Sequence, residues 1–166
     1  MSFDAFKDLE IFQGLTSEQC VLLQPVFLPF DYDSDTVIFE QGDPADHLYI
    51  VVKGEVVVSF KPDDGPPIVV ARIQPGGVVG WSAAIRSRKY TSSAMTVSET
   101  ELLRVRGDDL RSLYDNYPTF GGLLLDRLAE RITERVRNTH PQVVALLELG
   151  LKKPTSLQEV KDVAPR

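Results

Sequence analysis

Residues 80–84 combine a glycine, an indole, a hydroxyl and small side chains in a pattern that suits the binding of a small anion. Gly80 precedes Trp81, Ser82 and Ala83, and we expect a short helix to begin directly after the glycine. The first N–H groups of a helix have no partner within it, and they attract negative charge. Ser82 adds a hydroxyl, so these four residues are candidates for holding a phosphate or another small anion.

A second group of candidates follows a short basic run. Arg88 lies two residues before Tyr90, so the two side chains share one face if a strand begins there. Arg88 is therefore the best candidate for a cation at the site, with Tyr90 and Thr91 beside it, although a solvated loop charge is the commoner role. Trp81 has two interpretations: a stacking surface for a planar ligand, or an apolar plug in a disused pocket.

Other kinds of chemistry lack the residues that they need. Cys20 is the only cysteine, which excludes an intrachain disulfide and a cysteine-based metal cluster. His47 and His140 show no ligand spacing, and the sequence contains neither a P-loop nor a Gly-x-Ser-x-Gly motif. We therefore expect a protein that is not an enzyme and that holds no metal and no resident cofactor.

Charge and hydropathy limit the partners and the location. The net charge of −6 argues against non-specific nucleic-acid binding, which needs a basic face. The first residues lack the basic region of a signal peptide, and no apolar run reaches the length of a membrane span. We expect a cytoplasmic protein with one domain over residues 1–150 and a mobile tail over residues 151–166.

The elements that position the candidate site are mainly short strands. Residues 1–25 have helical spacing, with an N-cap at Thr16. Between residues 26 and 106, apolar runs alternate with turn residues, which predicts a sandwich or barrel with helices at its ends. The predicted strands are Val26–Phe30, Val37–Glu40, Leu48–Val52, Glu55–Phe60, Ile68–Ile73, Ser92–Ser98 and Glu101–Arg106.

Helical spacing returns over residues 107–150. We expect a short helix that ends before Pro118 and a longer one from about Thr119 to Thr139. The long helix carries an apolar row that either packs within the domain or forms a homodimer interface. The row consists of Leu124, Leu128, Ile132 and Val136. The pair Gly121–Gly122 is either a hinge or a place of close backbone packing.

Several segments resemble the cyclic-nucleotide-binding domain family, the sensor half of catabolite-activator-type regulators. They are Ile11–Leu15, Thr36–Asp46, Leu48–Val56, Val79–Ala84, Glu101–Leu103 and Leu128–Arg131. The resemblance implies a β-roll or jelly roll with N-terminal helices, followed by a short and a long C-terminal helix. It also implies a regulatory role, a cyclic nucleotide or another small anion as ligand, and a homodimer formed through the long helix.

Two residues of the family pattern are replaced. In the family an arginine pairs with the cyclic phosphate and a glutamate binds the ribose 2′-hydroxyl, whereas Tyr90 and Trp81 stand at these positions. A neutral phenol cannot replace a guanidinium, and the lost charged contact is worth about 1.5–3 kcal/mol. An indole offers no acceptor for a hydroxyl. We therefore expect weak binding of cAMP and cGMP, or none.

Two functions of different class remain open. The first is a regulatory sensor, in which a ligand repositions the C-terminal helices and changes the contact with an unknown protein partner. The second is a ligand-free interaction or oligomerisation module with a vestigial pocket. Only residues 141–166 follow the long helix, and they are too few and not basic enough for a helix-turn-helix, so we expect no direct DNA binding.

Overall fold

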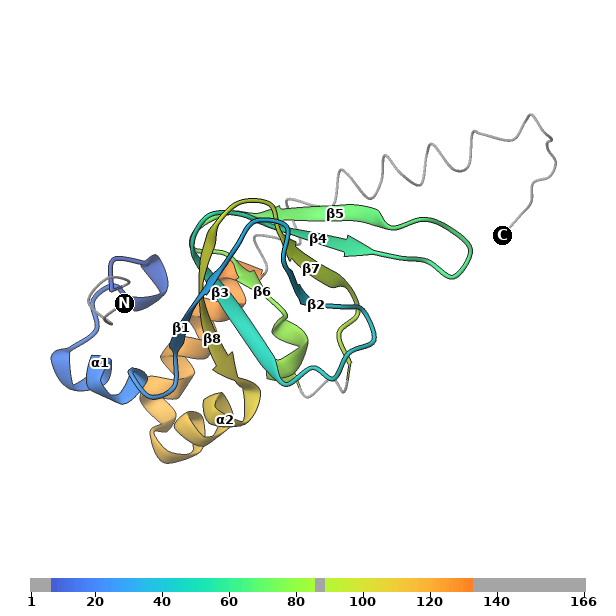
Figure 1. The fold of residues 1–166 in the computed structure, drawn as a ribbon. Helices are drawn as coiled ribbons and strands as arrows, with labels where there is room; N and C mark the ends of the chain where they lie inside the picture. Colours follow the sequence, from blue (N-terminus) through green and yellow to red (C-terminus); the bar gives the residue numbers. More distant parts are fainter. Residues whose placement is uncertain (1–6, 86–88, 133–166) are drawn as a thin grey trace.

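The core of the molecule is a roll of two antiparallel sheets with helices on one side (Figure 1). The structure is a computed structural model that describes residues 7–85 and 89–132. The first sheet has the strand order β1 (Leu28–Tyr32), β8 (Thr100–Arg106), β3 (His47–Lys53) and β6 (Val78–Val79). The second has the order β2 (Val37–Phe39), β7 (Ser93–Thr96), β4 (Val56–Phe60) and β5 (Ile68–Ile73). The predicted jelly-roll fold is confirmed.

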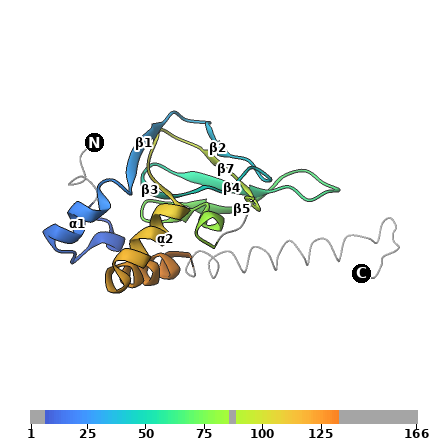
Figure 2. The same cartoon turned by 90° about the horizontal axis from the view of Figure 1, so that it is seen from below.

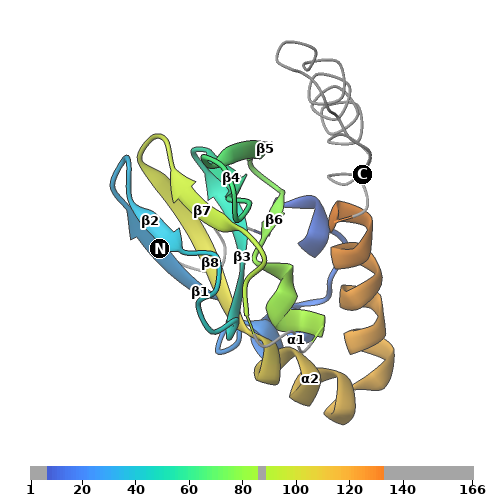
Figure 3. The same ribbon diagram turned by 90° about the vertical axis from the view of Figure 1, so that its right-hand side faces the viewer.

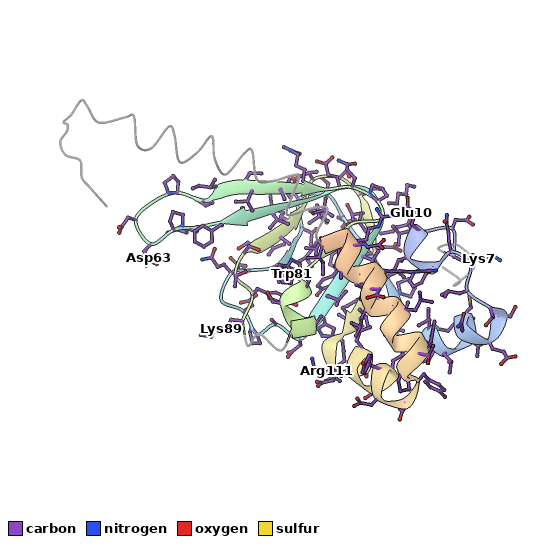
Figure 4. All side chains as sticks on the ribbon, turned by 180° about the vertical axis from the view of Figure 1, so that it is seen from behind. Lys7, Glu10, Asp63, Trp81, Lys89 and Arg111 are labelled. Carbon is purple, nitrogen blue, oxygen red and sulfur yellow. The ribbon has the colours of Figure 1, made fainter. Side chains whose placement is uncertain are left out.

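All seven predicted strands are present, and no end differs from its prediction by more than two residues. The sequence analysis missed β6, because two valines in a glycine-rich stretch give no strand signal. β6 pairs with β3, which places Val79 opposite Tyr49. The β4–β5 hairpin projects from the roll, and Asp63 lies at its tip (Figures 1 and 4).

The alternating side chains of the first sheet pack into two separate apolar clusters. We call the first the helix-side cluster, which consists of Ile11, Phe12, Leu23, Phe27, Leu48, Ile50, Val78, Leu103, Val105, Leu110, Leu113, Phe120, Leu124 and Leu128. We call the second the roll cluster, which consists of Phe39, Ala45, Tyr49, Val51, Val56, Val58, Ala71, Ile73, Val79, Tyr90, Ala94 and Leu102. The first sheet thus separates the helices from the interior of the roll (Figure 3).

The N-terminal segment forms a 3₁₀ helix, η2 (Glu10–Phe12), and the helix α1 (Ser17–Leu23). The predicted N-cap is confirmed as a capping box: the Thr16 hydroxyl accepts from the Gln19 N–H at 3.1 Å, and the Gln19 side chain accepts from the Thr16 N–H at 2.9 Å. Phe12 packs edge-on against Phe27, with ring centroids 5.2 Å apart. This contact joins the N-terminal segment to the helix-side cluster.

Two helices follow the roll, and they lie along one side of the sheets (Figure 2). The helix α2 (Gly107–Asn116) ends before Pro118, as predicted, and residues 118–132 form the next helix. Arg127 Nη1 donates to the carbonyl oxygens of Ile11 at 2.9 Å and Gln13 at 2.7 Å. Arg131 forms an ion pair with Glu10, so this helix also holds the N-terminal segment in place.

The first residues of the apolar row on the long helix pack within the domain. Leu124 and Leu128 are only 1% and 3% exposed and belong to the helix-side cluster, and Ile132 packs against it. The prediction that Leu124 and Leu128 form a homodimer interface is therefore corrected. The helix turns these two side chains toward its own sheet, where burial from water stabilises the domain. Val136, the predicted end of this helix and the predicted tail lie outside the described residues.

The glycine pair after Pro118 supports close packing. A Cβ on Gly121 would lie 2.5 Å from the Tyr114 Cα, so the helix formed by residues 118–132 approaches α2 at van der Waals distance. Gly122 has more space, with its nearest neighbour at 3.9 Å. Of the two interpretations of this pair, the contact at Gly121 favours close packing over a hinge.

Candidate functional site

The candidate site begins where β6 ends. Gly80 follows Val79 with φ +76°, and the 3₁₀ helix η3 (Trp81–Ile85) follows the glycine, as predicted. A Cβ on Gly80 would lie 3.1 Å from the His47 carbonyl oxygen and 3.2 Å from the Tyr90 ring. Both the backbone conformation and the close neighbours require glycine at this position.

Tyr90 lies inside the roll. Its side chain is 5% exposed and belongs to the roll cluster. Its ring stacks on Phe39, with centroids 3.7 Å apart and planes 15° apart. Its hydroxyl donates to the His47 carbonyl oxygen and accepts from the His47 N–H at 3.2 Å. Both the ring and the hydroxyl of Tyr90 are thus engaged within the domain.

The backbone around Tyr90 is fixed as well. The Tyr90 N–H donates to the Asp43 carbonyl oxygen at 2.9 Å, and the Gly42 N–H donates to the Tyr90 carbonyl oxygen at 2.9 Å. The loop between β2 and β3 therefore holds this residue from the other side. Moving Tyr90 out of the roll would break these contacts as well as those of its hydroxyl.

The phenols in this region carry no charge near neutral pH. Burial raises the pKa of Tyr90, although its hydrogen bond to His47 acts in the opposite direction. Burial also raises the pKa of Tyr49, and the neighbouring Tyr90 adds to the increase. Because both groups stay protonated, Tyr90 supplies neither a cation for a phosphate nor an anion that would repel one.

Trp81 points away from the roll interior. It packs against the helix-side cluster, whereas Tyr90 belongs to the roll cluster on the other side of the first sheet. Trp81 thus takes neither of its two predicted positions, since it does not plug the roll and does not line it. Its contacts are those of an apolar residue between η3 and the helices.

The other predicted site residues that the structure describes lie on η3 or directly after Tyr90. Ala83 is buried and Ser82 is half-buried on η3, whereas Thr91 is exposed beyond Tyr90. The Ala83 carbonyl oxygen accepts from Arg111 Nη1 at 3.4 Å, so η3 contacts α2. Arg88, the predicted cation, lies outside the described residues.

Two residues of this corner were missed by the sequence analysis. Phe39 provides the ring on which Tyr90 stacks, and the main chain of His47 binds the Tyr90 hydroxyl. Burial, followed by the charge of Arg104, lowers the pKa of the His47 side chain. A single sequence contains no signal that pairs Phe39 with Tyr90, because their contact depends on the closure of the roll.

Sequence comparison agrees with this geometry. The family described as "Cyclic nucleotide-binding domain" matches residues 29–117, which include the strands, the glycine-rich corner and α2. The chain belongs to this family. The matched range includes Gly80, Trp81 and Tyr90, whose contacts are described above.

Known proteins similar to this cyclic nucleotide-binding domain are mostly regulators. A CRP-like cAMP-activated global transcriptional regulator of Mycobacterium tuberculosis is 29% identical over 128 residues, which cover 77% of this chain and 57% of that protein. The acetyltransferase Pat of Mycolicibacterium smegmatis is 31% identical over 128 residues, which cover 77% of this chain and 37% of that protein. The chain thus spans little more than half the length of the regulator.

A solved structure shows the same fold. The crystal structure of a cyclic nucleotide-binding domain from Methylobacillus flagellatus matches with a TM-score of 0.76 and 23% identity, covering 86% of this chain and 83% of the other.

Over residues 7–85 and 89–132, we find no group of three or more metal-ligating side chains. None of the helices in these ranges is long and apolar enough to cross a membrane.

Proposed function

We propose that this domain is a regulatory module, not an enzyme, which binds cAMP and cGMP weakly or not at all and acts on a protein partner through its C-terminal helices. Membership of the family supports the regulatory role. The observation that carries the proposal is the position of Tyr90, which fills the phosphate-binding corner with a neutral ring.

The cost of nucleotide binding follows from the contacts of Tyr90. The missing guanidinium contact removes about 1.5–3 kcal/mol, or one to two orders of magnitude in affinity. A phosphate that entered the corner would also displace the Tyr90 hydroxyl from His47, and each hydrogen bond of this kind is worth about 1 kcal/mol. Together these terms weaken binding by about a hundredfold or more relative to a member of the family with the arginine.

A chain of close contacts supports an output through the helices. A Cβ on Gly107 would lie 2.2 Å from the Ala83 carbonyl oxygen, so the start of α2 lies directly against η3. Arg111 reaches the same oxygen. The contact between Gly121 and Tyr114 then joins α2 to the helix formed by residues 118–132. A movement of η3 would therefore displace the start of α2 directly.

The same helix offers a second face for a homodimer. Leu125 is 39% exposed, Ala129 is exposed and Ile132 is partly exposed, at the spacing i, i+4 and i+7 that places them on one side. In the family, regulators pair through the equivalent helix. We place the dimer contact on this exposed row, beside the buried row of Leu124 and Leu128.

A second candidate is a ligand-free interaction or oligomerisation module. The stack of Tyr90 on Phe39 favours it, because the corner is occupied by the domain's own side chains. The two candidates differ in whether any ligand changes the helices. In the module, the dimer and the partner contact are permanent, whereas in the sensor they respond to a ligand.

Calorimetric titration of the full chain with cAMP and with cGMP tests the proposal. We expect no saturable heat at micromolar nucleotide, because no cation replaces the missing arginine among the described contacts of Tyr90. A dissociation constant in the low-micromolar range or below for either nucleotide would contradict it. Light scattering gives the oligomeric mass, and a change in that mass on addition of either nucleotide would exclude the ligand-free module.

A further inference from the structure

The face of the first sheet that looks into the roll carries an arginine on β8. Leu103 and Val105, the neighbours of Arg104 in sequence, belong to the helix-side cluster, whereas Leu102 belongs to the roll cluster. Because side chains alternate along a strand, Arg104 points to the same side as Leu102. Arg104 is partly exposed, so solvent reaches part of this residue.

Aromatic side chains surround this arginine. The guanidinium carbon of Arg104 lies 3.9 Å from the centroid of the Phe30 ring on β1. On the other side, Arg104 is in register with Tyr49 of β3. Tyr32 follows Phe30 on the same face of β1 and packs against the roll cluster. The guanidinium of Arg104 thus contacts the ring of Phe30, and Tyr32 adds a second partly exposed ring on the same face of β1.

This place is separate from the corner of Tyr90. The pairing of Arg104 with Tyr49, and of Tyr49 with Val79, puts two strand spacings, about 10 Å, between Arg104 and the strand that leads to Gly80. Tyr49 stands between them, with its ring stacked toward Phe39 at 6.0 Å between centroids. Closure of the corner by Tyr90 therefore leaves Arg104 accessible.

Arg104 lacks a carboxylate partner in the described part of the chain. No ion pair or hydrogen bond joins its guanidinium to another residue of 7–85 or 89–132, and its contact there is the ring of Phe30. A guanidinium has five N–H donors in a planar fork. Next to an apolar cluster, such donors gain more from an anion than they would in water.

The imidazole and the phenols nearest to Arg104 do not oppose an anion, whereas the carboxylates of Asp46 and Asp109 lie near enough to His47 to act on its pKa. Burial and the charge of Arg104 lower the pKa of His47, so the imidazole is neutral at pH 7. Burial raises the pKa of Tyr32, and the charge of Arg104 acts against that increase. Tyr32 and Tyr49 are thus neutral phenols that can donate hydrogen bonds, and neither brings a negative charge beside the guanidinium.

We propose that Arg104, with Phe30 and Tyr32, forms a binding subsite for a small aromatic molecule that carries one anionic group. The fork of the guanidinium fits a carboxylate or a phosphate with two parallel hydrogen bonds. The rings of β1 accept the planar body of the ligand. This subsite goes beyond the proposed function, because it does not depend on whether cyclic nucleotides bind at the corner of Tyr90.

The test compares an anion with its neutral counterpart on the unmodified full chain. We would titrate benzoate, benzamide and phenyl phosphate and follow the backbone amide signals by NMR. Benzoate or phenyl phosphate should give saturable shifts in β1 and β8, and benzamide should bind at least tenfold more weakly than benzoate. The tighter of the two anions identifies the anionic group that the subsite prefers.

Variants then assign the binding to one side chain. Arg104→Gln should weaken the anion at least tenfold, whereas Arg72→Gln should change it less than twofold. Arg72 is a matched control, because it lies on β5 of the second sheet and pairs with Glu55 at 2.7 Å. If Arg104→Gln fails to fold, Arg104→Lys should bind the anion more weakly than wild type, because a point charge cannot form the paired contact.

Binding of benzamide as tight as that of the tighter anion would overturn the proposal, and so would an absence of saturable binding by both anions. An unchanged affinity in a folded Arg104→Gln protein would also overturn it. A failure here leaves the nucleotide titration unaffected, so the two results are distinguishable.

Discussion

Gly80 and Tyr90 occupy one corner of the roll, and the ring of Tyr90 leaves too little space for a side chain at Gly80. The missing side chain of Gly80 makes space for the ring of Tyr90, while the Tyr90 hydroxyl binds both main-chain groups of His47. Tyr90 thus completes the roll cluster at this corner.

Gly80→Ala should destabilise the domain by about 1–3 kcal/mol, since it adds both a strained backbone and close contacts. Gly14→Ala is the matched control, because Gly14 has nearly the same φ, +77°, but no atom within 4 Å of a Cβ. Urea unfolding of both variants measures the difference. Equal losses for the two variants would show that crowding at Gly80 contributes nothing.

Tyr90→Phe should cost about 1–3 kcal/mol of unfolding free energy, because it leaves the buried main-chain groups of His47 without their partner. Tyr114→Phe removes a hydroxyl from a side chain that is 43% exposed and should change the stability little. Chemical denaturation compares them. A Tyr90→Phe protein as stable as wild type would show that water replaces the hydroxyl.

His47 should make the stability depend on pH just below neutrality. Its folded pKa is lowered, first by burial and then by Arg104, so the unfolded chain binds the proton more readily. The stabilising contribution is therefore complete above the unfolded pKa and is lost as the pH falls below about 6.5. His47→Gln should reduce the loss of urea midpoint between pH 7.5 and 5.5, and an unchanged pH profile would refute this.

At the scale of elements, the sequence predicted the seven longer strands and the break at Pro118, because apolar alternation and turn residues are local signals. β6 was missed because two residues show no period. In the apolar row of the long helix, Leu124 and Leu128 pack within the domain, Ile132 is partly exposed, and Val136 lies outside the described residues. Periodicity shows that a helix has an apolar face, and only the closed fold shows what that face packs against.

Leu125→Asp should separate a homodimer into monomers with little change in folding, because Leu125 lies on the exposed row. Leu124→Asp should instead unfold the domain, because Leu124 is buried in the helix-side cluster. Light scattering after size-exclusion chromatography gives the masses, and circular dichroism gives the folding. A wild-type monomer at micromolar concentration, or a Leu125→Asp dimer, would refute the interface.

At the scale of the whole molecule, η3 joins the corner of Tyr90 to α2 and, through Trp81, to the helix-side cluster. The site was predictable only in part: the short helix after Gly80 could be read from the sequence, but the separation of Trp81 from Tyr90 could not. The two residues lie on opposite faces of the first sheet, and side-chain direction at the end of β6 depends on the register with β3. Long-range register is not encoded in a local pattern.

Gly107→Ala should loosen this connection, because its Cβ would meet the Ala83 carbonyl oxygen at 2.2 Å. Amide hydrogen exchange should rise in η3 and α2 and stay unchanged in the β4–β5 hairpin. Gly65→Ala, where the nearest atom is 3.4 Å away, is the control. Unchanged exchange in α2 would show that η3 and α2 are not coupled.

The central claim is that Tyr90 closes the phosphate-binding corner, and calorimetric titration of cAMP into wild type, Tyr90→Phe and Tyr90→Arg proteins tests it most directly. We expect Tyr90→Arg to bind at least tenfold more tightly than wild type, because it restores the charged contact. Tyr90→Phe should gain nothing, because it removes the hydroxyl without adding a cation. Wild-type binding as tight as that of a folded Tyr90→Arg protein would contradict the account.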